Sequence, residues 1–356
     1  MPDTPAAAPQ PNAIALWWRE RTSRVKVKRA EARLQRSAAE LACEHIVSQT
    51  NPALRGLPGY RRRLRPVAER ILAHGETLLA AVPGPVLVDQ AAWNKDPLVN
   101  ALFADLKRLQ QVVSGRAVQR WLHAHPGFDG ELYGLLVTMP EEHRRLGMEL
   151  VGERVQRDVK QTTLSFTDTE IIAVAADMDA LRAALRQPIA DLLVSLGHGR
   201  IAARQERIKA LEESLAMLRA KQRALLRPSV GNARLALGGG SLPAGDLDRL
   251  GVAIEEAQHD LADARRGLAD IQDYLASLIA ELDHPERELQ LETMHLWVDR
   301  MNLVHDRRTE GAHEIRLVRG RRLDRAGRVA QYVRFPRGLV QDIDARLDDV
   351  ARQIGG

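Results

Sequence analysis

Residues 247–284 read LDRLGVAIEEAQHDLADARRGLADIQDYLASLIAELDH, and this stretch gives the clearest structural pattern in the chain. Apolar residues or alanines recur in it at alternating steps of three and four, over five heptads. They are Leu247, Leu250, Ile254, Ala257, Leu261, Ala264, Leu268, Ile271, Leu275, Leu278 and Leu282. Side chains at this spacing form one seam along an α-helix, which is typical of a coiled coil.

An earlier stretch, residues 201–227, can supply the partner helix. Its apolar positions are less regular, because Arg204 and Gln222 interrupt them. Residues 201–227 carry a net charge of +4, whereas residues 247–284 carry a net charge of −6. Opposite charges favour pairing of the two stretches with each other over pairing of either stretch with itself. The alternative is a coiled coil between two chains.

These stretches divide the chain into four expected parts. Residues 1–15 are expected to be disordered, and residues 16–187 to form a basic helical region. Residues 188–285 are expected to form an antiparallel coiled-coil hairpin, with a glycine-rich tip at residues 228–246. Residues 286–356 are expected to add a helix, a basic β-hairpin and a terminal helix, all packed on the head.

Helix signals dominate the N-terminal half. Aromatic residues make up only 4% of the chain, so the core must rest on aliphatic side chains, a mixture that favours helices. Asp96 and Pro97 combine a capping acid with a proline at the first helical position. Further helices are expected after Pro140 and over residues 169–186, with a short strand at 162–166. The predicted fold class is mainly α: a helical head with a projecting antiparallel coiled-coil hairpin and a small C-terminal β-hairpin.

The C-terminal part predicts a pair of strands. A helix is expected over residues 286–304, followed by a β-hairpin over residues 313–335. Residues 324–327, with the sequence DRAG, fit a type I turn with glycine in the left-handed position. This turn would set Leu323 opposite Val329. The side chains expected on the polar face of the hairpin are Arg316, Arg322, Tyr332 and Arg334.

Composition also indicates the compartment. The single cysteine, Cys43, cannot form an intramolecular disulfide, and a lone thiol fits a reducing compartment. No run of apolar residues approaches the roughly 20 that a membrane-spanning helix requires. We therefore expect a cytoplasmic protein without membrane insertion.

A search for catalytic chemistry finds little. The chain has no phosphate-binding G-x-x-x-x-G-K-[ST] loop, no G-x-G-x-x-G, no H-E-x-x-H and no G-x-S-x-G. Four acidic residues lie in one segment and could hold a cation: Asp168, Glu170, Asp177 and Asp179. Asp168 and Glu170, however, lie at an expected helix start, where the helix dipole favours acids. His123 and His125 are two residues apart and would diverge on a helix. We therefore assign no catalytic residue, no metal ligand and no cofactor.

Basic residues are the best functional candidates. The net charge of the chain is +5, but residues 1–70 carry +8 and residues 307–337 carry +7. Arginine pairs with phosphate through its planar fork, and an aromatic ring can stack on a base. An arginine-rich surface that only keeps the protein in solution is the alternative. The candidate nucleic-acid-binding residues are Arg316, Arg322, Arg325, Tyr332, Arg334, Lys26, Lys28, Arg61, Arg62 and Arg63.

The function expected from the sequence is that of a non-enzymatic nucleic-acid-associated or complex-assembly protein, which uses basic surfaces and a coiled-coil arm. Its expected partners are a nucleic acid and a protein that docks on the hairpin. The first alternative is a purely protein-binding coiled-coil scaffold, and the second is a hydrolase with an unrecognised active site. Binding to phosphates weakens steeply as salt rises, whereas an apolar protein contact persists, so salt dependence separates the first two.

Overall fold

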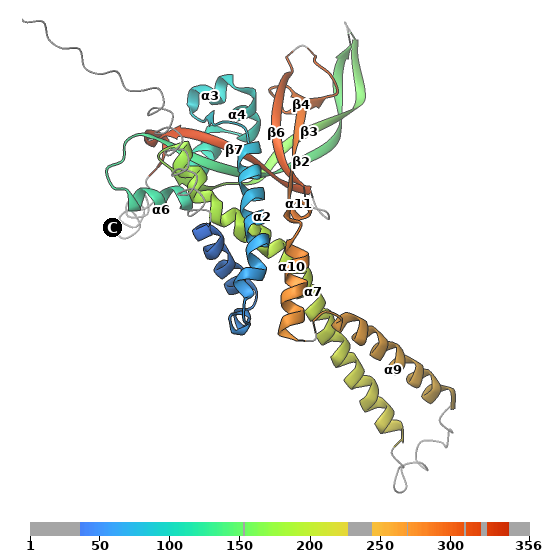
Figure 1. Cartoon of the computed structure of the whole chain (residues 1–356). Coiled ribbons are helices and arrows are strands. Elements are labelled where there is room, and N and C mark those ends of the chain that lie inside the picture. The colour runs from blue at the N-terminus through green and yellow to red at the C-terminus, as the bar shows by residue number, and fades with distance from the viewer. Residues whose placement is uncertain are drawn as a thin grey trace, which may run out of the picture.

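The computed structural model describes residues 36–151, 154–226, 244–268, 270–309, 311–321 and 326–341. Figure 1 shows a head that contains a twisted sheet, and a pair of long helices that extends away from it. Four expectations lie outside the described residues: the disordered N-terminus, most of the glycine-rich tip, the turn of the C-terminal hairpin and nearly all of the terminal helix.

The head is built on a seven-stranded sheet in the order β1-β7-β2-β3-β5-β4-β6. Strand β6 also pairs with β7, so six strands close into a ring, and β1 lies parallel to β7 outside it. The strands are β1 (Val86–Leu87), β2 (Glu131–Val151), β3 (Arg154–Ala175), β4 (Gln290–Val298), β5 (Leu303–His305), β6 (His313–Arg321) and β7 (Ala326–Pro336). The prediction of a mainly α fold with only a small C-terminal β-hairpin is therefore wrong.

Strands β2 and β3 replace the helix that the sequence predicted after Pro140 and the first part, up to Ala175, of the helix predicted over residues 169–186. Residues 178–186 are helical, as predicted. The two strands pair along almost their whole length and extend past the ring as a two-stranded ribbon. Leu146, expected to point inward from a helix, lies on this ribbon and is 65% exposed. A ribbon outside the core imposes no burial pattern on its residues, so their spacing resembled that of a helix by coincidence.

The expected helix over residues 286–304 is also wrong. Only the short helix α11 (Pro285–Glu288) forms there, and strands β4 and β5 follow it. Met294, Leu296 and Val298 are two residues apart, and all three pack inside the ring with Ile315 and other apolar residues. An interval of two residues is the period of a β-strand, and the helix predicted over residues 286–304 did not take it into account.

The β6–β7 pairing is present, but its register differs from the prediction. Val329 lies opposite Arg319 rather than opposite Leu323. Phe335 continues past the hairpin and pairs with Leu132 of β2. Since β7 pairs with β1 and β2 as well as with β6, the hydrophobic requirements of the larger sheet set its register, and the turn sequence alone does not.

Helices cover both faces of the β7-β2-β3 part of the sheet. On one face lie α3 (Gln90–Lys95), α4 (Pro97–Leu102), α5 (Leu106–Val113) and α6 (Arg116–Ala124). On the other face, side chains of α2 (Tyr60–Ala81) and α7 (Met178–Leu226) pack against the sheet. The predicted helix start at Asp96 is confirmed, because its carboxylate accepts a hydrogen bond from the backbone amide of Leu98 at 2.8 Å.

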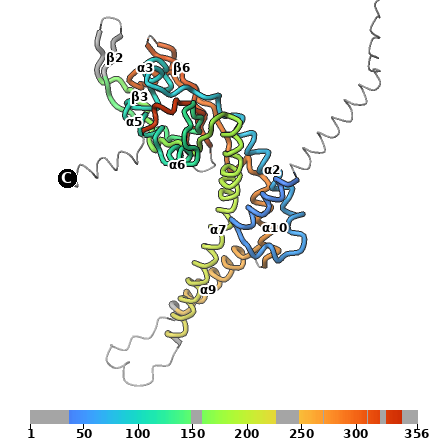
Figure 2. The backbone as a smooth tube through the Cα atoms, turned by 90° about the vertical axis from the view of Figure 1, so that its left-hand side faces the viewer, coloured from blue at the N-terminus to red at the C-terminus, as the bar shows by residue number. Residues whose placement is uncertain are grey.

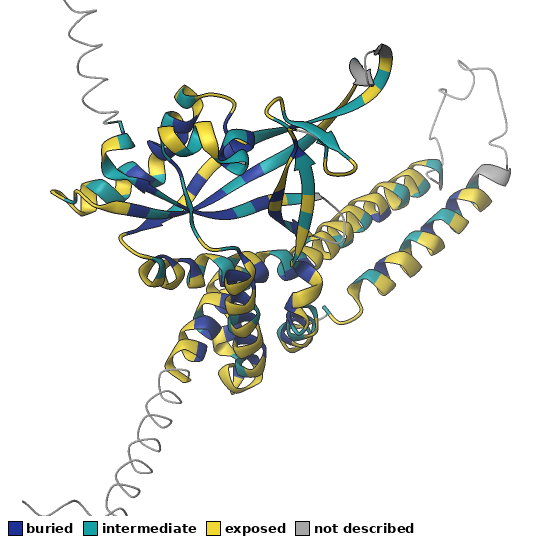
Figure 3. Cartoon of the chain, turned by 90° about the horizontal axis from the view of Figure 1, so that it is seen from above, coloured by how far each residue is buried: buried dark blue, intermediate teal, exposed yellow. Residues whose placement is uncertain are grey.

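A helical base lies below the sheet. A helix over residues 36–50, the 3-10 turn η1 (Pro52–Gly56), α2, α7 and α10 (Ile271–Leu282) share one hydrophobic core there. Beyond the base, α7 and α9 (Ala244–Arg265) run antiparallel and side by side (Figures 1 and 2). Most of their surface is exposed in Figure 3. Their contact is formed by Leu215, Leu250, Ile254 and Leu261.

The expected unbroken seam from Leu247 to Leu282 is interrupted. The chain leaves the helical conformation between α9 and α10, where Gly267 has a φ of +72°. After this break Leu275 and Leu278 pack into the base instead of continuing the α9 seam. Among the described helices, none is both long enough and apolar enough to cross a membrane.

Candidate anion-binding cleft

The structure removes Tyr332 from the predicted binding surface. Its side chain has no exposed area, and its hydroxyl donates a hydrogen bond to the backbone carbonyl of Leu79 at 3.1 Å. The face of β7 that was expected to be polar is covered by side chains of α2 and α7, so β7 carries apolar contacts on both of its faces. Tyr332 cannot stack on a base.

The other predicted residues do not form one surface. Arg61, Arg62 and Arg63 lie in the first turn of α2 in the helical base, and Arg61 forms an ion pair with Glu44 at 2.8 Å. Arg334 lies on β7 and forms an ion pair with Glu131 at 2.9 Å. Arg316 is exposed on β6. Lys26, Lys28, Arg322 and Arg325 lie outside the described residues.

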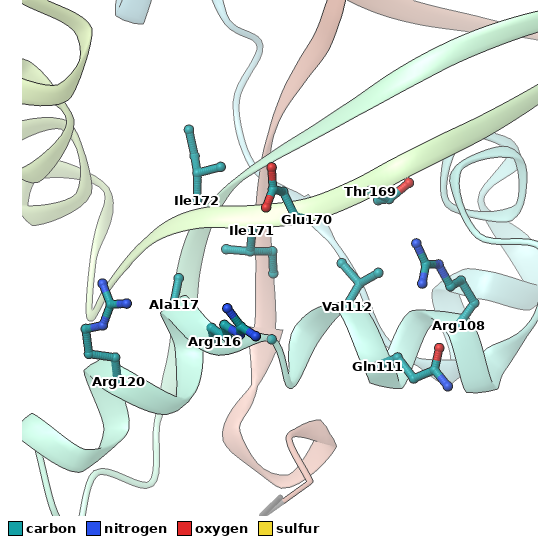
Figure 4. Close-up of a pocket in the computed structure, with 11 residues that line it drawn as sticks. Arg108, Gln111, Val112, Arg116, Ala117, Arg120, Thr169, Glu170, Ile171 and Ile172 are labelled. Atoms are coloured by element: carbon teal, nitrogen blue, oxygen red, sulfur yellow. The ribbon is translucent and has the colours of Figure 1, made fainter. Parts of the chain in front are cut away.

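A different group of arginines comes together at a cleft between α5, α6 and β3. The cleft has a volume of about 370 Å³. Figure 4 shows Arg108 and Gln111 on α5 and Arg116 and Arg120 on α6, across from strand β3. The remaining lining residues are Val112, Gly115, Ala117, Thr169, Glu170, Ile171 and Ile172.

The amphipathic character of α5 and α6 positions these arginines. Asp105 caps α5 by accepting a hydrogen bond from the backbone amide of Arg108 at 2.6 Å. Leu109 and Val112 are buried against the sheet, so Arg108 is left on the outer side. On α6 the buried residue is Val118. Arg116 and Arg120 are four residues apart on the exposed side, so they are neighbours on one helix face.

Strand β3 forms the opposite wall. Thr138 donates a hydrogen bond to the Thr167 carbonyl at 2.9 Å, so the buried Thr169 hydroxyl, 2.7 Å away, donates to Thr138. These bonds fix the strand at the cleft. The pairing of β3 with β5 is confined to Thr162 and Thr163. Over residues 169–172, therefore, β3 has no strand partner on its second edge within the described part of the chain.

The cleft carries an excess of positive charge. Within the described ranges, no side chain forms an ion pair or hydrogen bond with the guanidinium of Arg108, Arg116 or Arg120. Glu170 is the single acid among the lining residues that the structure describes, and Arg328 pairs with it at 2.7 Å. Three exposed guanidinium groups that have no counter-ion among the described residues suit an anion that accepts hydrogen bonds from several planar forks, such as phosphate.

A signal for this site was present in the sequence. Residues 106–124 contain Lys107, Arg108, Arg116 and Arg120 and no acidic residue. The net charge of this segment is smaller than that of residues 1–70 or 307–337, so a comparison of net charges favours those two segments instead. Only the packing of α5 and α6 against one strand shows that its cations share a cleft.

The described part of the chain contains no candidate metal site. Among those residues, no three side chains of histidine, cysteine, aspartate or glutamate are grouped to hold a metal ion. Comparison of the chain with protein-family models, with curated proteins and with solved structures gave no match.

Proposed function

We propose that this chain is a non-enzymatic, nucleic-acid-associated protein of the cytoplasm that holds a phosphate backbone in the α5–α6–β3 cleft. The observation that carries the proposal is the set of three exposed arginines, Arg108, Arg116 and Arg120, which lie along one side of the cleft and have no ion-pair partner in the part of the chain that the structure describes. Phosphate contacts of this kind position a nucleic acid and carry no sequence information directly.

The arrangement of the arginines favours a polyanion over a single small anion. Arg116 and Arg120 are one helical turn apart, which corresponds to a rise of about 6 Å along α6. Arg108 extends the row onto a second helix. A row of cations along a cleft that is open at its surface matches successive charges along a backbone better than one carboxylate.

Binding of labelled oligonucleotides to the full chain tests the proposal. At about 50 mM salt, wild-type protein should bind single-stranded or duplex oligonucleotides of random sequence. The Arg108→Gln, Arg116→Gln, Arg120→Gln triple variant should bind at least tenfold more weakly, with unchanged melting temperature, since exposed substitutions usually cost within about 0.5 kcal/mol each.

A control variant removes the same charge elsewhere. Arg204, Arg207 and Lys209 are exposed on the projecting part of α7, and their joint replacement by glutamine should leave affinity within about twofold. Absence of binding by wild-type protein would reject the proposal. An equal loss in the control variant would also reject it, since overall charge would then be responsible.

A second candidate function is protein binding through the α7–α9 pair. Met217 on α7 is 73% exposed and Val252 on α9 is 55% exposed, although exposed apolar side chains are unfavourable in water. A partner held by these residues should remain bound at high salt after nuclease treatment, and the Met217→Ser, Val252→Ser double variant should release it. If no partner of this kind exists, this candidate is rejected.

A further inference from the structure

The end of α6 carries an aromatic pair beside the arginine cleft. The rings of Trp121 and His125 stack with centroids 4.0 Å apart and planes 15° apart. Phe128 supports Trp121 edge-on, with centroids 5.0 Å apart and planes at 88°. Trp121 is half-buried, whereas His125 is exposed. The imidazole of His125 therefore lies over a fixed tryptophan ring.

Hydrogen bonding also fixes the orientation of the imidazole. His125 Nδ1 lies 2.9 Å from the backbone carbonyl oxygen of Trp121. A carbonyl oxygen can only accept, so Nδ1 carries the proton and donates. The other ring nitrogen, Nε2, is not involved in this bond. The imidazole of His125 is therefore held in one orientation at the surface.

This pair lies at the end of the helix that lines the cleft. Ala117 lines the cleft, and Trp121 follows four residues later on α6, so the two share one stripe of the helix. His125 is the residue directly after α6, and its ring stacks on Trp121 at the end of this stripe. Arg116 and Arg120 directly precede Ala117 and Trp121 in the sequence. Two cations of the cleft and a ring that can stack on a base are therefore carried by one short helix and the residue that follows it.

We infer that the cleft and the His125 platform together bind single-stranded nucleic acid in preference to duplex. This inference rests on the proposed phosphate-binding function and names the class of nucleic acid. In a duplex the bases stack on each other, and their faces are not available to a protein side chain. In a single strand an unstacked base can lie on an aromatic ring while the backbone follows the basic groove.

Anisotropy titrations with three labelled probes test the inference on the full chain. The probes are a single strand of about 12 nucleotides, the duplex of the same sequence, and a strand of equal length without bases. Wild-type protein should bind the single strand at least tenfold more tightly than the duplex or the abasic strand. His125→Ala should weaken single-strand binding about tenfold, because base–aromatic stacking is lost, and should leave abasic-strand binding unchanged.

Two further variants separate stacking from other effects. His125→Phe keeps a flat ring and should retain single-strand affinity within about threefold. His259→Ala changes an exposed histidine on α9 and should have no effect. Equal affinity for duplex and single strand, or an unaltered His125→Ala variant, would overturn the inference while the phosphate-binding proposal stands. If wild-type protein binds none of the three probes, the proposal and the inference both fail.

Discussion

The hydroxyl of Tyr332 on β7 donates its hydrogen bond to the backbone carbonyl of Leu79 on α2, with 3.1 Å between the oxygens. Both residues are buried, and burial raises the pKa of the Tyr332 hydroxyl. The contact joins the central sheet to the helix that leads into the base. An aromatic residue in an arginine-rich segment therefore stabilises the interior and is not available to a ligand.

Replacing Tyr332 by phenylalanine should lower the free energy of unfolding by about 1–3 kcal/mol, because the buried Leu79 carbonyl would lose its side-chain donor. Tyr133→Phe is the matched control on the neighbouring strand, where the ring is only half-buried, and it should change stability by less than about 0.5 kcal/mol. Urea unfolding measures both. If the Tyr332→Phe variant had normal stability but no longer bound oligonucleotides, the conclusion that Tyr332 does not contact the ligand would be wrong.

The contact of α7 with α10 at Gly197 can be tested with two glycines of one helix. A Cβ atom placed on Gly197 would lie 2.6 Å from Leu282 Cδ2, in the hydrophobic core of the base. Gly197→Ala should therefore destabilise the protein by about 1–3 kcal/mol, since Leu282 must move. Gly199 has open space around it, so Gly199→Ala should stabilise the helix by about 0.5–1 kcal/mol.

Thermal or urea unfolding distinguishes the two glycine variants by the sign of the change. If both alanine variants are stabilised, the helices of the base are further apart than the structure shows. If both are destabilised, a general intolerance of α7 to side chains, and not its contact with α10, would be responsible.

Glu44 should make the base sensitive to acid. A hydrogen bond from the Tyr60 hydroxyl, followed by bonds from Arg55 and Arg61, lowers the pKa of Glu44 from 4.5 to about 2. Since the folded pKa lies below the unfolded one, the stabilisation is complete above pH 4.5 and is lost as the pH falls towards 2. Solvent reaches a third of the Glu44 side chain and screens these contacts, so we expect only about 1 kcal/mol at neutral pH.

Melting curves of wild-type protein and Glu44→Gln between pH 7 and pH 3 measure this contribution. The variant should melt at a lower temperature at pH 7, and the difference between the two curves should become smaller as the pH falls from 4.5 to 3. Glu40→Gln, which alters a more exposed carboxylate, should show a smaller difference at every pH. A difference for Glu44→Gln that stays constant over this range would contradict the assignment.

Part of the fold could be predicted from local sequence signals. The helix start at Asp96 depends on a cap and a proline within two residues, and the prediction is confirmed. Strand β2 depends instead on two partners, β3 directly after it and β7 about 200 residues later. Nothing in the local spacing near Pro140 indicates those partners, and the proline itself resembled a helix start.

The candidate site was harder to predict than the fold. Charge counts selected Arg61 and Arg334, which form ion pairs with Glu44 and Glu131. Whether an arginine is available to a ligand depends on its neighbours in space, which the sequence does not give. Arg116 and Arg120 could have been noticed as a basic pair one helical turn apart, but the wall that β3 forms opposite them could not.

The most direct test of the arginine cleft is the salt dependence of single-strand binding. For single strands, the slope of log K against log salt concentration changes by about 0.7 for each phosphate that a cation neutralises. The slope for wild-type protein should therefore be steeper by about 2 than that of the Arg108→Gln, Arg116→Gln, Arg120→Gln variant. Equal slopes for the two proteins would show that these arginines contact no phosphate and would contradict the account.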